Sequence, residues 1–367
     1  MVCKERSSMK KVLCLIDGLG SGGAQRQLVG LANLLKDKGY DVLFVWYHTS
    51  EFYKEFLDDN GVKYEQIHAT NIFQKFWRIS RVISHFKPDA IISYIDGPNM
   101  ATCLLKALGL KSTIIVSERA VLQKINAHQK RKFFLYRWAD FIVSNAQEQT
   151  DLINRYFPSL RIKTVTIRNF VDTSVFMPSN TINESDDIKM LVVGRLAPQK
   201  NIINFMQAVK KVQKSGISLY VKWFGGHSHG KEEFEKEMMT KYKEMSFGNT
   251  FKFLPPTRDI IAEYQACDVF CLPSLFEGFP NVVCEAMSCG KPIVCSDVND
   301  NAVIVHHNEN GLLFDPKSVE DMTDKIIKFC QLSKKERIEM GKKSREIALE
   351  SMSGDAFVEK YIQLIEK

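Results

Sequence analysis

The chain has 367 residues, of which 45% are apolar, 25% charged and 11% aromatic. This composition excludes a disordered chain, a collagen-like repeat and a small disulfide scaffold, and the length predicts two domains. The net charge of +7 is unevenly spread, because residues 1–170 carry 25 Lys and Arg against 15 Asp and Glu, and the remainder carries 25 against 28. The first half therefore suits an anionic partner such as nucleic acid, an acidic membrane surface or a phosphorylated substrate.

The sequence predicts a cytoplasmic protein. No apolar run approaches the roughly 20 residues that a membrane span needs, and the polar start from Met1 to Lys11 predicts no secretion signal. Most of the nine cysteines lie in apolar runs, which indicates buried, reduced thiols. Cys267, Cys271, Cys284 and Cys289 lack the paired two-residue spacing of a zinc site, so we expect no metal centre there.

Short apolar runs alternate with helix-length amphipathic segments along the chain. The runs that predict strands are Val12–Ile16, Val42–Trp46, Ala90–Tyr94, Thr113–Val116, Phe141–Ser144, Met190–Val193, Leu219–Phe224, Thr250–Phe253, Val269–Leu272 and Pro292–Cys295. Because these runs are apolar throughout, they indicate parallel sheets buried on both faces. The polar stretch from Asp172 to Asp187 is the predicted linker, and the chain after about Ser333 is predicted to be helical. We therefore expect an α/β protein with two Rossmann-like, doubly wound domains.

A glycine cluster follows the first predicted strand. Gly18, Gly20 and Gly23 satisfy the G-x-G-x-x-G spacing of a dinucleotide site, but the next strand ends in Trp46-Tyr47-His48 without the acidic residue that holds a ribose. A nicotinamide enzyme is therefore disfavoured. Two interpretations stay open: a turn that lets the backbone approach an anionic ligand, and a tight turn with no ligand.

The second half carries two charged pairs in the same kind of position. Arg195 and Lys200 flank a turn that follows a predicted strand. Two interpretations stay open: the two cations bind one diphosphate together, or both remain solvated on the surface. Glu277 and Glu285 lie eight positions apart across a Gly–Pro turn that opens a helix. Glu285 falls in an apolar stretch, so its carboxylate needs hydrogen-bond donors such as sugar or ribose hydroxyls.

These pairs, with the early turn Gly22-Gly23-Ala24-Gln25, resemble the GT-B, family 4 retaining glycosyltransferases (glycosyl transferases group 1) over nearly the whole chain. The resemblance implies two Rossmann-like domains with an interdomain cleft and a C-terminal helix that crosses back to the first domain. It implies an acceptor-binding domain at residues 9–171, with the helix at 353–367, and a nucleotide-sugar donor-binding domain at 172–352.

The resemblance also implies roles for individual residues. Arg195 and Lys200 would bind the donor diphosphate, Glu285 the ribose and Glu277 the transferred sugar. The other implied donor contacts are Gly22, Gly23, Gly194, Leu254, Gly278, Phe279, Pro280, Asn281 and Val282. Retention implies that the acceptor attacks the same face of the sugar from which the diphosphate departs, and that the departing phosphate oxygen takes the acceptor's proton. The less favoured alternative is that Glu277 acts as a covalent nucleophile. No Asp-x-Asp occurs in the sequence, so we expect neither metal nor other cofactor, and cations with helix amides would neutralise the diphosphate.

One position departs from the family pattern. Many members place a histidine after Ser-Glu at the end of a first-domain strand, whereas Ser117-Glu118 is followed here by Arg119. A guanidinium can stabilise a phosphate or a sugar hydroxyl, so Arg119 is included among the candidate catalytic residues, but it cannot shuttle a proton.

Two basic and aromatic segments stand out in the first half, a predicted helix from Ile72 to Lys87 and the stretch from Lys130 to Trp138. Taken alone, each is explained by a packed helix with solvated basic flanks. Given the resemblance, we expect a shallow surface that faces an anionic membrane or the acceptor's headgroup. Its candidate residues are Lys75, Trp77, Arg78, Arg81, Lys130, Arg131 and Lys132.

The expected function is transfer of a sugar from a UDP- or GDP-sugar to a glycan or polyprenyl-diphosphate-linked acceptor, in surface polysaccharide or glycolipid assembly. The expected location is the cytoplasm, at the inner face of the membrane. Two alternatives stay open, a nucleotide-sugar epimerase on the same fold and a basic nucleic-acid-binding protein. The sequence contains no zinc finger, RNP-like aromatic pair or basic zipper, so a nucleic acid is not the expected partner.

Overall fold

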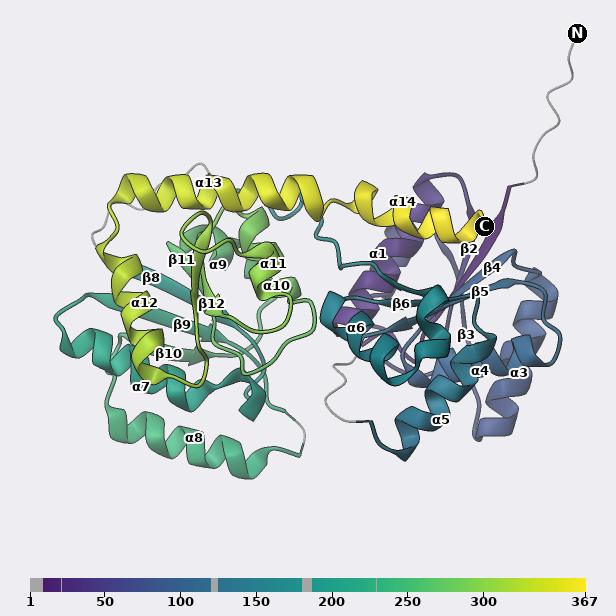
Figure 1. Cartoon of the computed structure of the whole chain (residues 1–367), viewed down its shortest axis with the longest axis horizontal. Helices are drawn as coiled ribbons and strands as arrows, with labels where there is room; N and C mark the ends of the chain where they lie inside the picture. Colours follow the sequence, from purple (N-terminus) through teal and green to yellow (C-terminus); the bar gives the residue numbers. More distant parts are fainter. Residues whose placement is uncertain (1–8, 21, 120–124, 180–186, 229) are drawn as a thin grey trace, which may run out of the picture. The chain divides into compact units, whose positions relative to one another are not determined.

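Figure 1 shows the computed structural model of the chain, which describes residues 9–20, 22–119, 125–179, 187–228 and 230–367. The chain divides into two compact units. The first unit comprises Met1–Asn169 together with Gly354–Lys367, and the second comprises Phe170–Ser353. Each unit is a parallel sheet with helices on both faces.

The sheet of the first unit has the strand order β3-β2-β1-β4-β5-β6-β7 in the described part of the chain. Its strands are β1 Lys11–Leu15, β2 Asp41–Trp46, β3 Lys63–Gln66, β4 Ala90–Tyr94, β5 Thr113–Glu118, β6 Phe141–Ser144 and β7 Thr164–Thr166. The helices are α1 Gly23–Asp37, α2 Lys54–Asp59, α3 Ile72–Phe86, α4 Asp96–Ala107, α5 Ala127–Leu135, α6 Gln147–Tyr156 and α14 Gly354–Ile365.

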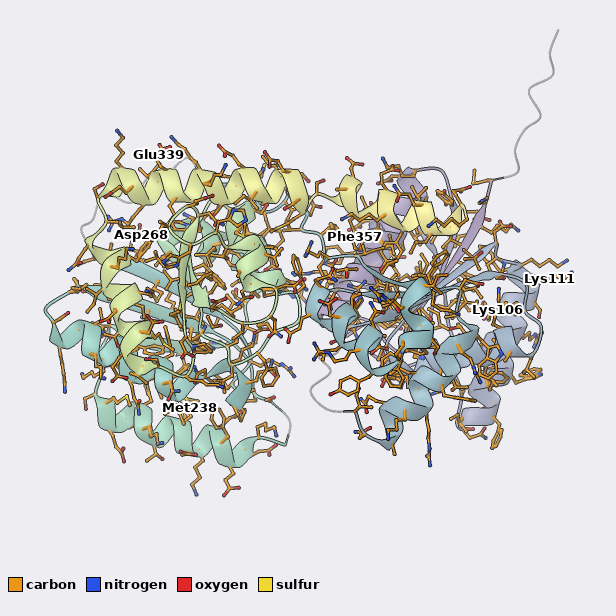
Figure 2. The ribbon with its side chains drawn as sticks, in the orientation of Figure 1. Lys106, Lys111, Met238, Asp268, Glu339 and Phe357 are labelled. Atoms are coloured by element: carbon orange, nitrogen blue, oxygen red, sulfur yellow. The ribbon has the colours of Figure 1, made fainter. Side chains whose placement is uncertain are left out.

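The order of the strands reverses between β1 and β4. Because parallel crossovers are right-handed, this reversal sends α1 to one face of the sheet and α3, α4 and α5 to the other. The returning helix α14 packs against α1, and Phe357 of α14, labelled in Figure 2, is buried. The carboxyl ends of β1 and β4 thus form the switch point at which doubly wound sheets bind ligands.

The sheet of the second unit has the order β10-β9-β8-β11-β12-β13. Its strands are β8 Ile188–Val193, β9 Leu219–Phe224, β10 Phe251–Leu254, β11 Val269–Leu272, β12 Ile293–Ser296 and β13 Gly311–Phe314. The helices are α7 Ile202–Lys214, α8 Glu232–Met245, α9 Ile260–Ala266, α10 Asn281–Ser288, α11 Asn301–Ile304, α12 Val319–Gln331 and α13 Lys334–Ser351. One apolar core packs α7, α8 and α12 on one face, and a second packs α9, α10 and α13 on the other.

All ten predicted strands are present, and the predicted helical end of the chain is confirmed as α13 and α14. The strands that the sequence did not predict are β3, β7 and β13, and all three lie at sheet edges. Of these, β3 and β7 are buried less completely, so their sequences need not be continuously apolar. The sequence of β3, Lys-Tyr-Glu-Gln, is accordingly polar.

At the end of β5, two neighbouring charged residues point to opposite faces of the sheet. Successive side chains of a strand point to opposite faces, so Glu118 points toward α5 and Arg119 toward α14. Glu118 is buried, with Lys132 Nζ 2.6 Å from its Oε2 and the Tyr136 hydroxyl donating to its Oε1. Lys132 therefore does not belong to the surface for which it was predicted: its side chain is 1% exposed, because Glu118 holds it in the interior.

Arg119 joins the end of the sheet to the C-terminal helix. Its guanidinium donates to the hydroxyls of Tyr94 and of Tyr361 in α14, and to the side-chain oxygen of Asn169. The hydroxyls of Tyr94 and Tyr361 lie 2.8 Å apart. Burial raises the pKa of the Tyr94 phenol, against the opposing charge of Arg119, so the phenol remains a neutral partner of the cation.

The predicted linker from Asp172 to Asp187 is partly wrong. Residues 172–179 pack on the second unit instead, because Phe176 contacts its apolar core and the Arg345 guanidinium donates to the carbonyls of Thr173 and Phe176. The part of the predicted linker at residues 180–186 lies outside the described residues.

Helix α3 spans Ile72–Phe86 and confirms the predicted helix to within one residue. Ile79 and Ile83 are buried, whereas Ile72 is 73% exposed in the first turn. Phe73 and Trp77 are also exposed. Across the described residues, we find no helix that is both long and apolar enough to cross a membrane.

We predict that Lys132→Met lowers the free energy of unfolding by about 3–5 kcal/mol, because it leaves the buried Glu118 carboxylate without its cation. Urea unfolding measures the loss. The matched control is Lys130→Met, two residues away on the exposed side of α5, which should change stability by no more than about 0.5 kcal/mol. Equal effects of the two substitutions would contradict the assignment of Lys132 to the interior.

Candidate functional site

Three strand ends of the second unit are tied together by backbone contacts. After β8 and β9, the Gly194 amide donates to the carbonyl of Phe224 at 2.9 Å, and the Gly225 amide donates to that of Leu254 at 3.0 Å. A Cβ atom on Gly225 would lie only 1.9 Å from the Gly194 carbonyl oxygen. Gly225 is therefore required by close approach of the backbone, and it brings the loops after β8, β9 and β10 to one place.

The loop after β8 places Lys200 against the loop after β11. Lys200 Nζ lies 2.5 Å from Glu277 Oε1, and both side chains are largely buried. The Leu275 amide also donates to the carbonyl of Gln199 at 2.8 Å. The two sequence-predicted residues Lys200 and Glu277 thus form one ion pair, although 77 positions separate them.

The Glu277 side chain is oriented by further contacts. The Ser274 hydroxyl donates to the same Oε1 at 2.5 Å. The Glu277 amide donates to Asn299 Oδ1 at 2.8 Å, from the loop after β12. Oε2 has no hydrogen-bond partner among the residues that the structure describes. One oxygen of the carboxylate is therefore fixed and the other is available to a ligand.

Glu285 is buried on α10, as the sequence indicated, and it has a protein donor. The Tyr264 hydroxyl, from α9, donates to Glu285 Oε2 at 2.9 Å. No side chain caps α10 at Pro280, and the Val282 amide makes no hydrogen bond to the described residues. A carboxylate and a helix amide thus occur on one short helix, where the helix dipole favours an anion.

The other predicted donor contacts lie in the same loops of the second unit. Gly278, Phe279 and Pro280 connect Glu277 to α10, and Asn281 is the first residue of that helix. Leu254 ends β10. Arg195 is exposed on the loop between Gly194 and Lys200. The structure therefore brings these residues to the carboxyl edge of the second sheet.

The remaining predicted residues lie in the first unit. Gly22 precedes α1, Gly23 is its first residue, and both follow β1. Arg119 follows β5, and its two terminal amino groups are engaged by Tyr94, Tyr361 and Asn169.

Sequence reasoning missed three residues that shape the site, Ser274, Asn299 and Tyr264. Ser274 lies three positions before Glu277, and Asn299 stands in a polar run after β12. Tyr264 gives no local signal, because its contact with Glu285 depends on the packing of α9 against α10. Asn299 adopts a left-handed backbone conformation with φ of 50°, which asparagine tolerates better than most residues.

Together these groups offer two cations, two carboxylates and a helix amide at one edge of a sheet. Cations and amides suit a diphosphate, and carboxylates accept hydrogen bonds from sugar hydroxyls. Within the described ranges, no group of three or more His, Cys, Asp or Glu could hold a metal ion. Seven of the eight described cysteines are buried, as the sequence predicted, including Cys267, Cys271, Cys284 and Cys289.

Two families match the chain in succession. The family described as Glycosyltransferase Family 4 matches residues 21–175, and the family described as Glycosyl transferases group 1 matches residues 176–347. Together they account for most of the chain.

Individual proteins give the same result. The amylovoran biosynthesis glycosyltransferase AmsD of Erwinia amylovora is 26% identical over 322 residues, which is 83% of this chain and 88% of that protein. An α-1,4-N-acetyl-D-galactosaminyltransferase of Campylobacter jejuni, whose name specifies a diNAcBac-PP-undecaprenol-linked saccharide, is 27% identical over 83% of this chain and 84% of that protein. The crystal structure of HepE from Anabaena in complex with UDP has a TM-score of 0.84 at 18% identity, covering 97% of this chain and 99% of that one. This last likeness shows the GT-B fold.

We predict that Tyr264→Phe lowers the free energy of unfolding by about 1–3 kcal/mol, because it removes a hydroxyl donor from a buried carboxylate. Thermal or urea unfolding measures the loss. The matched control is Tyr220→Phe, whose hydroxyl has no partner in the described ranges and whose side chain is exposed. An unchanged stability in Tyr264→Phe would show that its hydroxyl does not support Glu285.

Proposed function

This chain belongs to the family 4 glycosyltransferases of the GT-B fold, and we propose that it transfers a sugar from a UDP- or GDP-sugar to a lipid-diphosphate-linked glycan. The transfer retains the anomeric configuration and needs no metal. The second unit binds the donor, and the first unit binds the acceptor. The reaction takes place at the cytoplasmic face of a membrane, in the assembly of a surface polysaccharide or glycolipid.

The observation that carries the donor assignment is the Lys200–Glu277 pair beside the buried Glu285. An ammonium group has three donors, so Lys200 can bind a phosphate oxygen while it holds Glu277. The open Oε2 of Glu277 accepts a hydrogen bond from a hydroxyl of the transferred sugar. Glu285 accepts from the ribose, with Tyr264 fixing its orientation.

In the proposed reaction, the bond between the sugar's anomeric carbon and the diphosphate oxygen breaks, and the acceptor oxygen bonds to the same carbon from the same face. The acceptor's proton passes to the departing phosphate oxygen. Arg195 and Lys200, with the amide of Val282, stabilise the negative charge that develops on the diphosphate. These fixed charges supply the neutralisation that a magnesium ion supplies in other transferases, which is why we propose a metal-independent reaction.

We predict that Lys200→Ala lowers kcat by about 100-fold to 1,000-fold, the usual cost of removing one donor to a developing anion. Glu285→Gln should lower kcat/KM for the donor strongly, because an amide cannot accept the ribose hydroxyls as a carboxylate does. Transfer is measured with UDP- and GDP-sugars, in the presence of EDTA. Lys214→Ala, an exposed lysine on α7, is the control and should leave the rate unchanged.

Two outcomes would contradict the proposal. Rates within a few-fold of wild type in both variants would reject the donor site. Conversion of the nucleotide-sugar without any acceptor would instead indicate an epimerase.

The proposed acceptor implies a membrane surface, and the helices on one face of the first sheet support this. Exposed apolar side chains occur on α3 at Ile72, Phe73 and Trp77. Others on this layer are Leu104 of α4, Leu108 directly after it, and Phe134 of α5. Because α3, α4 and α5 cover the same face of the sheet, these side chains belong to one layer of helices.

Cations accompany these apolar side chains. Arg81 Cζ lies 5.7 Å from the centre of the Trp77 ring, and Lys75 Nζ lies 3.9 Å from that of Tyr47. Lys130 and Arg131 are exposed on α5, and Lys111, which follows α4, points away from the fold in Figure 2. Apolar side chains between cations are the composition that binds an anionic lipid surface.

We predict that the double substitution Arg78→Ala/Arg81→Ala weakens binding to vesicles of phosphatidylglycerol about 30-fold, since each cation near an anionic surface contributes about 1 kcal/mol. Flotation at physiological salt measures the binding, with neutral phosphatidylcholine vesicles as the lipid control. Lys214→Ala/Lys241→Ala in the second unit makes the same change of charge and should not affect binding. Failure of the wild-type protein to float with the anionic vesicles would exclude the membrane surface.

A further inference from the structure

A second cluster of titratable side chains lies outside the donor site, at the carboxyl edge of the first sheet. Lys132 Nζ lies 2.6 Å from Glu118 Oε2 and 3.0 Å from Asp96 Oδ1. The other oxygen of Asp96, Oδ2, lies 3.0 Å from His128 Nε2. The chain of contacts therefore runs from a buried carboxylate at the end of β5 to an imidazole that is 55% exposed.

The buried part of the cluster fixes the exposed part. Tyr136 donates to Glu118 and itself accepts from Asn99 Nδ2 at 2.9 Å. Glu118 and Tyr136 thus hold Lys132 in place, and Lys132 engages one oxygen of Asp96 so that the other faces His128. Burial alone would raise the pKa of Asp96, but the hydrogen bond from His128 and the charge and hydrogen bond of Lys132 outweigh it and lower the pKa. Asp96 is therefore an anion that accepts from His128.

The backbone places Asp96 at the switch point of the sheet. Asp96 begins α4 immediately after β4, the strand beside β1 at which the strand order reverses. Ile95, which precedes it, has φ of 75° and ψ of 154°, a conformation nearly restricted to glycine. A β-branched residue held in this conformation shows that the surrounding contacts determine the backbone here.

The contact with Asp96 also determines which ring nitrogen of His128 remains available. In the neutral imidazole, Nε2 carries the proton that it donates to Asp96, so Nδ1 has the lone pair. Nδ1 has no partner within the described ranges. The ring is fixed by the carboxylate behind it and presents a hydrogen-bond acceptor to solvent.

We propose that His128, oriented by Asp96, binds a sugar hydroxyl of the acceptor through Nδ1 and so positions the acceptor for transfer. The inference rests on the proposed function, because it deepens the role of the first unit as the acceptor-binding domain. His128 does not take the proton, which still passes to the departing phosphate oxygen. It orients the hydroxyl, and its loss weakens acceptor binding without changing donor binding.

The charges around His128 favour a hydroxyl over a phosphate. The cluster has two carboxylates, Asp96 and Glu118, against the one cation of Lys132. The carboxylate of Asp96, which contacts Nε2, would repel a phosphate at the ring, whereas a neutral hydroxyl donates to the Nδ1 lone pair without that repulsion. The diphosphate of the acceptor accordingly belongs elsewhere, on the cations of α3.

The test compares His128→Ala with the wild-type full-length chain. The probes are GlcNAc and GalNAc diphosphates that carry a phenoxyalkyl tail, assayed with whichever UDP- or GDP-sugar the wild type uses. We expect KM for the acceptor to rise about tenfold, the usual effect of losing one hydrogen bond, while KM for the donor and the thermal shift by the free nucleotide stay unchanged. His128→Asn, which keeps an acceptor atom at the δ position, should recover most of the loss.

His85→Ala is the matched control, because His85 is an exposed histidine at the far end of α3. An acceptor KM in His128→Ala within twofold of that in His85→Ala would overturn the inference, and so would a loss confined to donor binding. Absence of any transfer by the wild type would overturn the proposed function and the inference together. Transfer by the wild type with no response at His128 would overturn the inference alone.

Discussion

Parallel pairing of strands is the constraint on which both units depend. Every strand pair described in the two sheets is parallel, so the carboxyl ends of the strands in each sheet collect at one edge. The loops that leave those ends bring together residues far apart in the sequence. Successive side chains of a strand point to opposite faces of the sheet, so Glu118 faces α5 and its neighbour Arg119 faces α14. The positions of charged side chains at these edges follow from the topology of each sheet, before any ligand is considered.

The two units use this edge differently. In the second unit, the loops after the neighbouring strands β8 and β11 bring Lys200 to Glu277, and this pair leaves donors and acceptors for a ligand. In the first unit, the Glu118 carboxylate at the end of β5 is buried and neutralised by Lys132. Lys132 also contacts Asp96, whose other carboxylate oxygen contacts the exposed His128. An open ion pair suits a charged nucleotide-sugar, whereas a fixed imidazole suits the neutral hydroxyl of an acceptor.

The sequence predicts the central strands well because a strand buried on both faces must be apolar throughout. It does not predict the polar edge strand β3, whose composition is that of a loop. Burial of Glu285 follows from its apolar neighbours, but its partner Tyr264 lies on another helix and has no local signal. Lys132 lies in a basic run, which predicts an exposed side chain. Nothing in that run indicates its contact with the buried carboxylate of Glu118, 14 positions away. Pairings between elements depend on tertiary packing, which local pattern does not encode.

We propose a retaining transfer that relies on protein charges in place of a metal. The most direct measurement is the anomeric configuration of the product, determined by proton NMR after transfer from an α-linked UDP- or GDP-sugar in excess EDTA. We predict an α-linked product, formed at the same rate with and without EDTA. A β-linked product, or a reaction that EDTA abolishes and magnesium or manganese restores, would contradict it.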